Sequence, residues 1–194
     1  MRVVTAVEPI NLDKDAEEVL CFLAGGITDC PDWQAKVIAN FKLYDKKFPG
    51  ALDKLVIANP RRENFPIDDP NASREQITWE FNALQEMDIF SMYFTAGPSD
   101  QPICLYELGR NLMRMQVMHG TDYYKRIVIS CDPDYSRAED VKIQTELMWT
   151  AYYGMRTMPA RFFGKPDIIV KADPLEHMYH IIRAYEYVKG TKNA

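Results

Sequence analysis

A glutamate near the start of an amphipathic segment is the strongest candidate for chemistry in this sequence. Glu107 lies in residues 102–111, after a loop that contains Pro98, Ser99 and Asp100. A carboxylate in the first turns of a helix lies near unpaired backbone N–H groups and the positive end of the helix dipole. Both favour the ionised form, which can attack a sugar carbon as a nucleophile. The alternative is an acidic residue that only marks a helix start.

Composition and charge limit the classes of protein that this chain can belong to. Its 194 residues fit a single domain, residues 1–194, with a sizeable core. The net charge of -5 and the pI near 5.3 argue against general nucleic-acid binding. No apolar run is long enough to span a bilayer, and the N-terminal residues lack a signal-peptide pattern. We therefore expect a cytoplasmic protein with no membrane partner.

Cysteines and histidines give no support for a metal site. The four cysteines form no Cys-x-x-Cys pair, and Cys21 and Cys131 lie in apolar runs typical of buried side chains. His177 and His180 are three residues apart on a predicted helix with no third ligand in view. We expect them to form a surface pair.

Short apolar runs that alternate with amphipathic segments predict the fold. The predicted strands are residues 19–24, 55–58, 89–94, 127–130 and 168–170, with 3–7 as a further edge strand. The predicted helices are residues 33–48 with Asp32 as N-cap, 73–87 with a Ser73/Gln76 capping box, 103–118, 138–153 and 174–188. Runs that are apolar on both faces are typical of buried parallel strands. The pattern predicts an α/β fold with a doubly wound parallel five-stranded sheet and flanking helices.

In an open parallel sheet, ligands bind beyond the carboxyl ends of the strands, where several candidates lie. The pair Gly25 and Gly26 would allow close approach of a ligand and leave N–H groups free for its oxygen atoms, or would simply form a tight turn. After the next strand come Asn59, Arg61 and Arg62. The arginines could bind a phosphate or carboxylate, or remain solvated at the rim.

Asp88 is a candidate of a different kind. It begins the predicted strand 89–94, and a carboxylate at the edge of an apolar strand needs a partner or a ligand. Strand direction places it at the end of the sheet opposite the expected site, so its alternative role is to support a loop.

Six segments occur in an order and with gaps typical of one family. They are residues 22–27, 32–34, 59–62, 79–80, 88–90 and 102–109. The pattern resembles the nucleoside 2-deoxyribosyltransferase superfamily, in particular its nucleoside 2-deoxyribosyltransferase-like branch. The resemblance implies a flavodoxin-like fold and chemistry at the N-glycosidic bond. A family glutamate that attacks the anomeric carbon of the sugar carries over to Glu107, and the resulting glycosyl-enzyme passes the sugar to another base or to water.

The leaving base needs an acid or a hydrogen-bond donor at its ring nitrogen. Asp100, Gln101 or Asp88 could supply that contact. Ser99 lies where nucleotide N-glycosidases of the superfamily often carry a serine, and Gln101 stands where its transferases carry an aspartate. Trp33 could stack on a base or pack in the core.

Two classes of function remain open. The first is an N-glycosidic-bond enzyme that needs no cofactor and acts on a nucleoside or nucleoside 5′-monophosphate. The alternative is a non-catalytic nucleotide-binding sensor or interaction module, which Phe22 favours because many family members have a tyrosine there. A homo-oligomer is expected, since residues 148–155 are rich in large side chains and family members commonly form dimers or rings.

Overall fold

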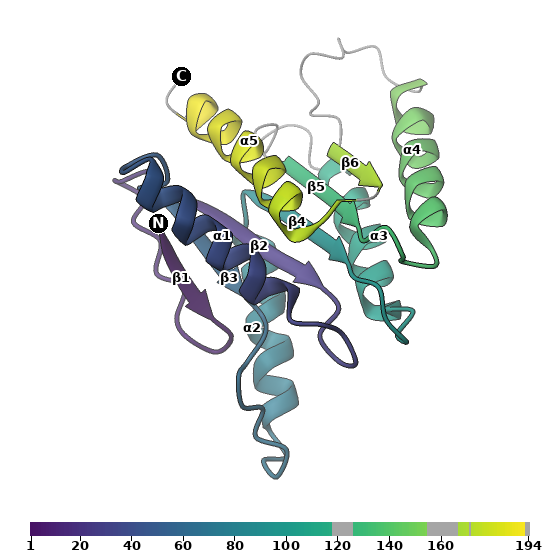
Figure 1. Ribbon diagram of the computed structural model, residues 1–194, viewed down its shortest axis with the longest axis horizontal. Helices are drawn as coiled ribbons and strands as arrows, with labels where there is room; N and C mark the ends of the chain where they lie inside the picture. Colours follow the sequence, from purple (N-terminus) through teal and green to yellow (C-terminus); the bar gives the residue numbers. More distant parts are fainter. Residues whose placement is uncertain (118–125, 155–166, 171, 193–194) are drawn as a thin grey trace.

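The computed structural model (Figure 1) describes residues 1–117, 126–154, 167–170 and 172–192. The strands are β1 (Arg2–Thr5), β2 (Val19–Gly25), β3 (Leu55–Asn59), β4 (Ile89–Phe94), β5 (Arg126–Cys131) and β6 (Asp167–Val170). The helices are α1 (Trp33–Lys47), α2 (Ala72–Glu86), α3 (Pro102–Val117), α4 (Ala138–Gly154) and α5 (Pro174–Lys192). None of the helices in these ranges is long and apolar enough to cross a membrane.

The strands form one parallel sheet. Their order is β1-β3-β2-β4-β5-β6, every neighbouring pair is parallel, and the arrowheads in Figure 1 point towards the same edge. Counted from β2, the inner strands follow the order 2-1-3-4-5 of flavodoxin-like folds. The predicted fold is confirmed, and β1 extends the five-stranded sheet at the edge beside β3, where the sequence placed a further strand.

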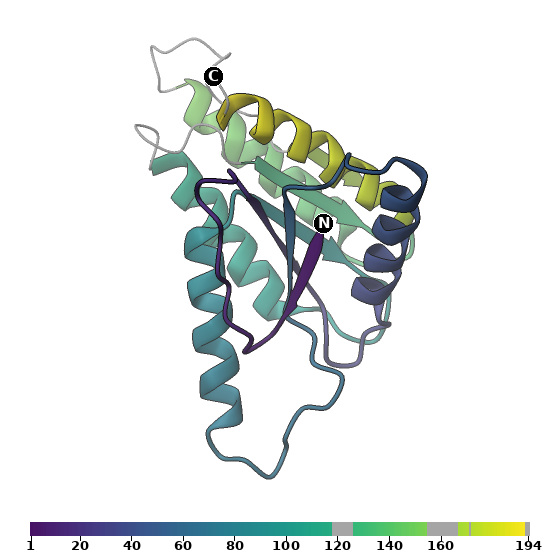
Figure 2. The ribbon, with the colours of Figure 1, turned by 90° about the vertical axis from the view of Figure 1, so that its left-hand side faces the viewer.

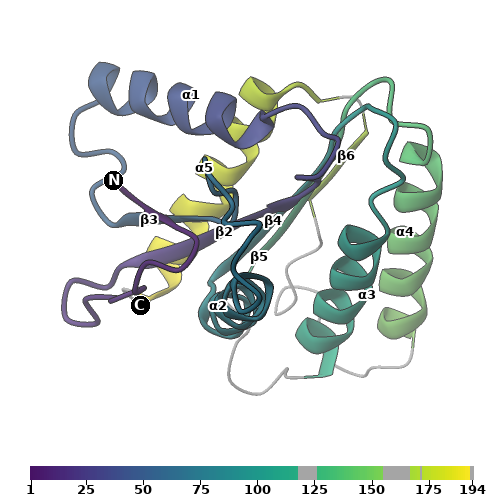
Figure 3. The ribbon, with the colours of Figure 1, turned by 90° about the horizontal axis from the view of Figure 1, so that it is seen from below.

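Helices cover both faces of the sheet, as Figure 3 shows from below. On one face α1 packs against α5, and α5 contacts β2, β4 and β5. On the other face α2 contacts β2, α3 contacts β4, and α4 lies beside β6. Side chains of β2 alternate between the two cores: Phe22 faces α2 and α3, whereas Cys21 and Leu23 face α1 and α5. Strands β2 to β5 are buried on both faces along most of their length.

One predicted helix start is wrong. The capping box was expected to begin at Ser73, but α2 begins at Ala72, so Ser73 and Gln76 lie inside the helix. Asn71 precedes the helix and gives it no side-chain cap within the described residues. The loop of residues 60–71 swings out beyond the sheet before α2 returns along it (Figures 1 and 2). Because Gln76 lies inside the helix, its side-chain amide can donate to Pro60 O, just after β3.

The expected surface pair of histidines is also wrong. His177 is fully buried and lies between two serine hydroxyls, with Nε2 2.7 Å from Ser91 Oγ and Nδ1 2.7 Å from Ser130 Oγ. A neutral imidazole offers one donor and one acceptor, and both serines adapt to either role. Burial, together with nearby His180, lowers the pKa of His177 to about 3. His177 therefore links α5 to β4 and β5 as a neutral core residue.

This histidine gives a pH-dependent stability. Its pKa is lower in the folded chain than in the unfolded one, so its contribution is complete above pH 6.5 and falls as the pH drops towards 3. The expected loss is about 1.4 kcal/mol per pH unit in that window. Urea unfolding at pH 7 and pH 5 measures it. His177→Gln should flatten the dependence, whereas His180→Gln should retain most of it; equal slopes for all three proteins would contradict this reading.

Candidate active site

The site lies where the chain changes direction in the sheet. The chain leaves β2 towards β3 on one side and leaves β4 towards β5 on the other, so the loops after β2 and β4 diverge. A cavity of about 290 Å³ opens between them. It is lined by Phe22, Ala24, Gly25, Gly26, Ile27, Thr28, Pro60, Glu80, Ser99, Gln101, Pro102, Ile103, Cys104 and Glu107.

Glu107 lies in this cavity, but its electrostatic setting differs from the expected one. α3 begins at Pro102 and has no acidic residue in its first turn, so Glu107 lies beyond the reach of the helix N-terminus. Burial and, to a lesser extent, nearby Glu80 raise the pKa of Glu107 to about 7, and Arg110 opposes both effects. The carboxylate is thus not held ionised by the helix. It is poised to gain or lose a proton near neutral pH.

Glu80 is a second carboxylate in the cavity, and the sequence analysis gave it no role. It projects from α2, and burial raises its pKa while a hydrogen bond from Gln76 lowers it. Nε2 of Gln76 lies 2.9 Å from Oε1 of Glu80. Residues 79–80 form one of the six family segments, and this was the one sequence signal that pointed to Glu80. The sequence does not show that α2 and α3 converge on one cavity.

Gln101 lines the cavity but has no free amide. Its Oε1 accepts from Gly26 N at 3.1 Å, and its Nε2 donates to Thr95 O at 2.7 Å. Its backbone φ of 52° lies in the left-handed region, which is costly for a residue with a side chain. Gln101 therefore joins the loops after β2 and β4, and the structure does not leave its amide available to a base.

Neighbouring protein atoms leave no room for a side chain at Gly25 or Gly26. A Cβ on Gly25 would lie 2.3 Å from Tyr93 O, and one on Gly26 would lie 2.5 Å from Cys30 Sγ. We expected the Gly26 N–H to be free for a ligand, but it donates to the Gln101 side chain. Both glycines still line the cavity, where the absence of side chains leaves room for a ligand.

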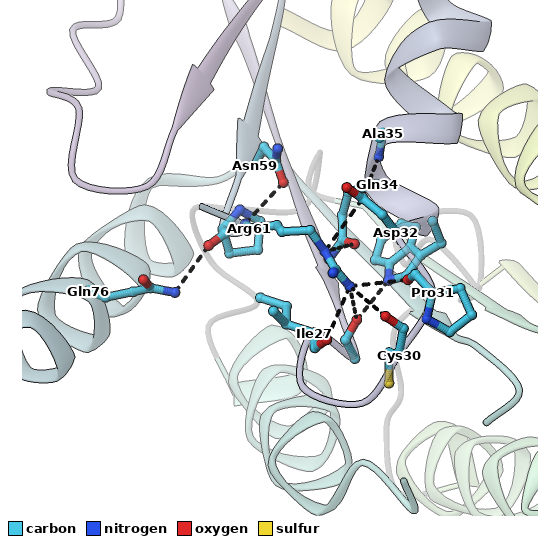
Figure 4. Close-up of polar contacts among 12 residues, drawn as sticks. Ile27, Cys30, Pro31, Asp32, Gln34, Ala35, Asn59, Arg61 and Gln76 are labelled. Carbon is cyan, nitrogen blue, oxygen red and sulfur yellow. Dashed lines mark hydrogen bonds and ion pairs between the residues drawn. The ribbon is translucent and has the colours of Figure 1, made fainter. Parts of the chain in front are cut away.

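Arg61 holds the loop after β2 rather than facing the cavity. Its Nη2 donates to four carbonyl oxygens, at 3.2 Å (Gly26), 3.3 Å (Ile27), 3.4 Å (Cys30) and 3.1 Å (Pro31). Its Nε lies 3.0 Å from Gln34 Oε1 and 3.5 Å from Asp32 Oδ1. Figure 4 shows this side chain reaching from the end of β3 into the curve of the loop. The guanidinium is a structural clamp.

The two residues beside Arg61 also lie outside the cavity lining. Asn59 Oδ1 accepts from Arg61 N at 3.1 Å and so shapes the turn after β3. Arg62 lies over the ring of Phe65, 5.7 Å from its centroid. Its Nη1 is buried and has no hydrogen-bond partner within the described part of the chain. Arg62 thus keeps an unused donor.

Three other candidates are not brought to the cavity. Asp88 lies at the opposite end of the sheet, where its Oδ2 accepts from Leu20 N and Lys192 Nζ, each at 2.9 Å. Asp100 is exposed and lies 3.5 Å from Arg137 Nε. Trp33 is buried, with its Nε1 3.1 Å from Gly26 O and its ring 5.1 Å from that of Tyr93. Each has a structural partner that explains its position, so we omit all three from the proposed site.

The rest of the cavity is mostly uncharged. Phe22 is buried and lies 6.3 Å from the ring of Trp79. Burial, with smaller electrostatic effects of Glu107 and Cys30, raises the pKa of the Cys104 thiol to about 12, so the thiol is neutral at physiological pH. Ser99 Oγ accepts from Gln101 N at 3.2 Å. The carboxylates Glu80 and Glu107 are therefore the main reactive groups of this cavity.

A comparison with known families matches the segment that contains this cavity. A family model described as nucleoside 2-deoxyribosyltransferase like matches residues 18–122, which include Glu80, Glu107 and both loops of the cavity. No curated protein was found to match the chain.

The clamp formed by Arg61 predicts a stability difference between two adjacent arginines. Arg61→Met should lower the free energy of unfolding by about 2–3 kcal/mol, since it leaves the buried Gln34 Oε1 without its donor and removes the guanidinium from four loop carbonyls. Arg62→Met should lower it by less than about 1 kcal/mol, because it removes an arginine with an unused donor. Chemical denaturation of the three proteins measures both. Equal losses would show that Arg61 is not the clamp.

Proposed function

The chain belongs to the nucleoside 2-deoxyribosyltransferase-like family, and on that premise we propose that it cleaves or exchanges the base of a nucleoside through a glutamate nucleophile, Glu107. The observation that carries the proposal is the meeting of two partly buried carboxylates, Glu80 and Glu107, in one cavity at the switch point of the sheet. Paired carboxyl groups of this kind serve glycosyl transfer in many enzymes.

In the first step, ionised Glu107 donates an electron pair to the anomeric carbon of the sugar. The bond between that carbon and the base nitrogen breaks, and its electron pair goes to the base. A proton from the Glu80 carboxyl group to the base makes it a better leaving group. The raised pKa of Glu80, caused mainly by burial, favours this acid role.

In the second step, another base or water attacks the same carbon and displaces Glu107. Glu80, now ionised, takes the proton that the incoming group loses, which completes the cycle. Transfer and hydrolysis differ only in which nucleophile occupies the cavity at this stage. We therefore propose glycosyl transfer and hydrolysis as two outcomes of one glycosyl-enzyme.

The charges of the cavity favour an uncharged nucleoside over a nucleoside 5′-monophosphate. None of the described lining residues is a lysine or arginine, and two are glutamates. Arg61, which suggested a phosphate site in the sequence, already donates to four carbonyls. Arg62 is the remaining candidate for a phosphate contact because of its unused donor.

Self-association remains part of the proposal. The side chains at 149 and 151–155, on which the sequence expectation depended, lie outside the described residues. A different observation supports a second copy near the cavity. Ile103, which lines it, is 68% exposed, and Tyr106 on the same helix is 66% exposed. Such apolar exposure at a ligand site is typical of surfaces that a partner covers.

Release of free base from a panel of purine and pyrimidine nucleosides, followed by chromatography, tests the proposal. The parent protein should release base, and Glu107→Gln should lose at least about a thousandfold in kcat/KM because it removes the nucleophile. The rate should fall as the pH rises through about 7, because the pair then loses the proton that Glu80 must give to the leaving base.

The matching 5′-monophosphates provide the control for charge. They should react at least about tenfold more slowly than the nucleosides, a difference of about 1.4 kcal/mol. If no substrate releases base, yet nucleosides bind in calorimetry, the chain is a binding module and the catalytic proposal fails.

A further inference from the structure

Gln76 lies outside the cavity lining and contacts two residues that line it, Pro60 and Glu80. Its Nε2 donates to Pro60 O at 3.1 Å and to Glu80 Oε1 at 2.9 Å. Pro60 follows β3 and Glu80 projects from α2, and both line the cavity, whereas Gln76 is not among the lining residues. Gln76 and Glu80 are four residues apart, so they occupy the same face of α2. One amide group thus ties the Glu80 carboxylate to the end of a strand.

The orientation of this amide is fixed by its partners. A carbonyl oxygen only accepts hydrogen bonds, so the group that faces Pro60 must be the NH₂ and not the oxygen. The same NH₂ faces Glu80 and supplies its second hydrogen to the carboxylate. Oε1 of Gln76 is buried and finds no partner in the described ranges of the chain. An unpaired buried acceptor costs free energy, so the two hydrogen bonds that Nε2 donates must outweigh this cost and set the orientation of the amide.

We propose that Gln76 is a positioning residue, which holds the Glu80 carboxylate against Pro60 and so decides which of Glu80 and Glu107 binds a proton more tightly. The inference deepens the proposed function and rests on it for its catalytic meaning. Gln76 itself does not touch the substrate in this account. It acts through Glu80.

The electrostatics follow from the geometry. A donor that always faces Glu80 favours its ionised form and lowers its pKa against the effect of burial. Ionised Glu80 in turn raises the pKa of Glu107. The other titratable groups around the pair are Arg110, which opposes that rise, and the thiols of Cys104 and Cys30. Glu107 therefore binds a proton more tightly than Glu80 does, and this proton must leave Glu107 before it can attack.

Gln76→Met tests this inference, because it keeps the length of the side chain and removes the donor. Carbon NMR of glutamate carboxyl groups follows both titrations, with Glu80→Gln and Glu107→Gln used for assignment. The titration midpoint of Glu80 should shift upwards and that of Glu107 downwards. Gln76→Asn, whose shorter amide cannot span Pro60 and Glu80 together, should give the same two shifts and serves if the Met variant does not fold.

Thr78→Val is the matched control. It removes a side-chain hydrogen bond from the same helix, between Thr78 Oγ1 and Arg74 O, at an exposed position. Its two carboxyl titrations should be those of the parent. Parent-like titrations in Gln76→Met or Gln76→Asn would overturn the inference. These measurements need no turnover, so a chain that releases no base, and thereby contradicts the proposed function, would still report on the role of Gln76.

Discussion

The cavity depends on one guanidinium group. Arg61 follows β3, yet its side chain reaches the loop after β2 and gathers four of its carbonyl groups around one nitrogen (Figure 4). Three of these carbonyls also accept from a second donor, so Arg61 adds to their hydrogen bonding and ties the loop to the end of β3. With the loop fixed, Gly26 can donate to Gln101 and its carbonyl can accept from Trp33. The wall opposite α3 is thus built from protein contacts before any ligand enters.

Glu107, which α3 carries into the cavity, shows how two physical effects compete. A helix N-terminus stabilises a nearby anion by about 0.3–1 kcal/mol, and the effect fades beyond the first turn. Burial and a neighbouring carboxylate raise the pKa of Glu107 from 4.5 to about 7, which corresponds to roughly 3 kcal/mol against the charged form. The effect of burial on the pKa of Glu107 therefore exceeds that of the helix dipole. A carboxyl group that titrates near neutral pH can change its protonation state during a reaction, and a permanently ionised one cannot.

The sequence predicted the fold better than the site. Strands buried on both faces leave a strong apolar signal, so the sheet and its helices could be located to within a few residues. Glu107 and Gly26 could be placed because strand ends converge at one edge. The structural role of Arg61 could not be predicted, because an exposed arginine and one that holds a loop look alike in a sequence. Glu80 was given no role, since its part depends on how α2 and α3 cross the sheet, and no local pattern records that.

The most direct test of the account is to find where the sugar becomes attached. The chain is incubated with a nucleoside that releases base, quenched in acid and examined by mass spectrometry, with fragment spectra that separate Glu107 from Glu80. The account predicts an added mass of one sugar unit on Glu107, and no such mass in Glu107→Gln. A sugar attached to Glu80, or base release without any attached sugar in rapidly quenched samples, would contradict it.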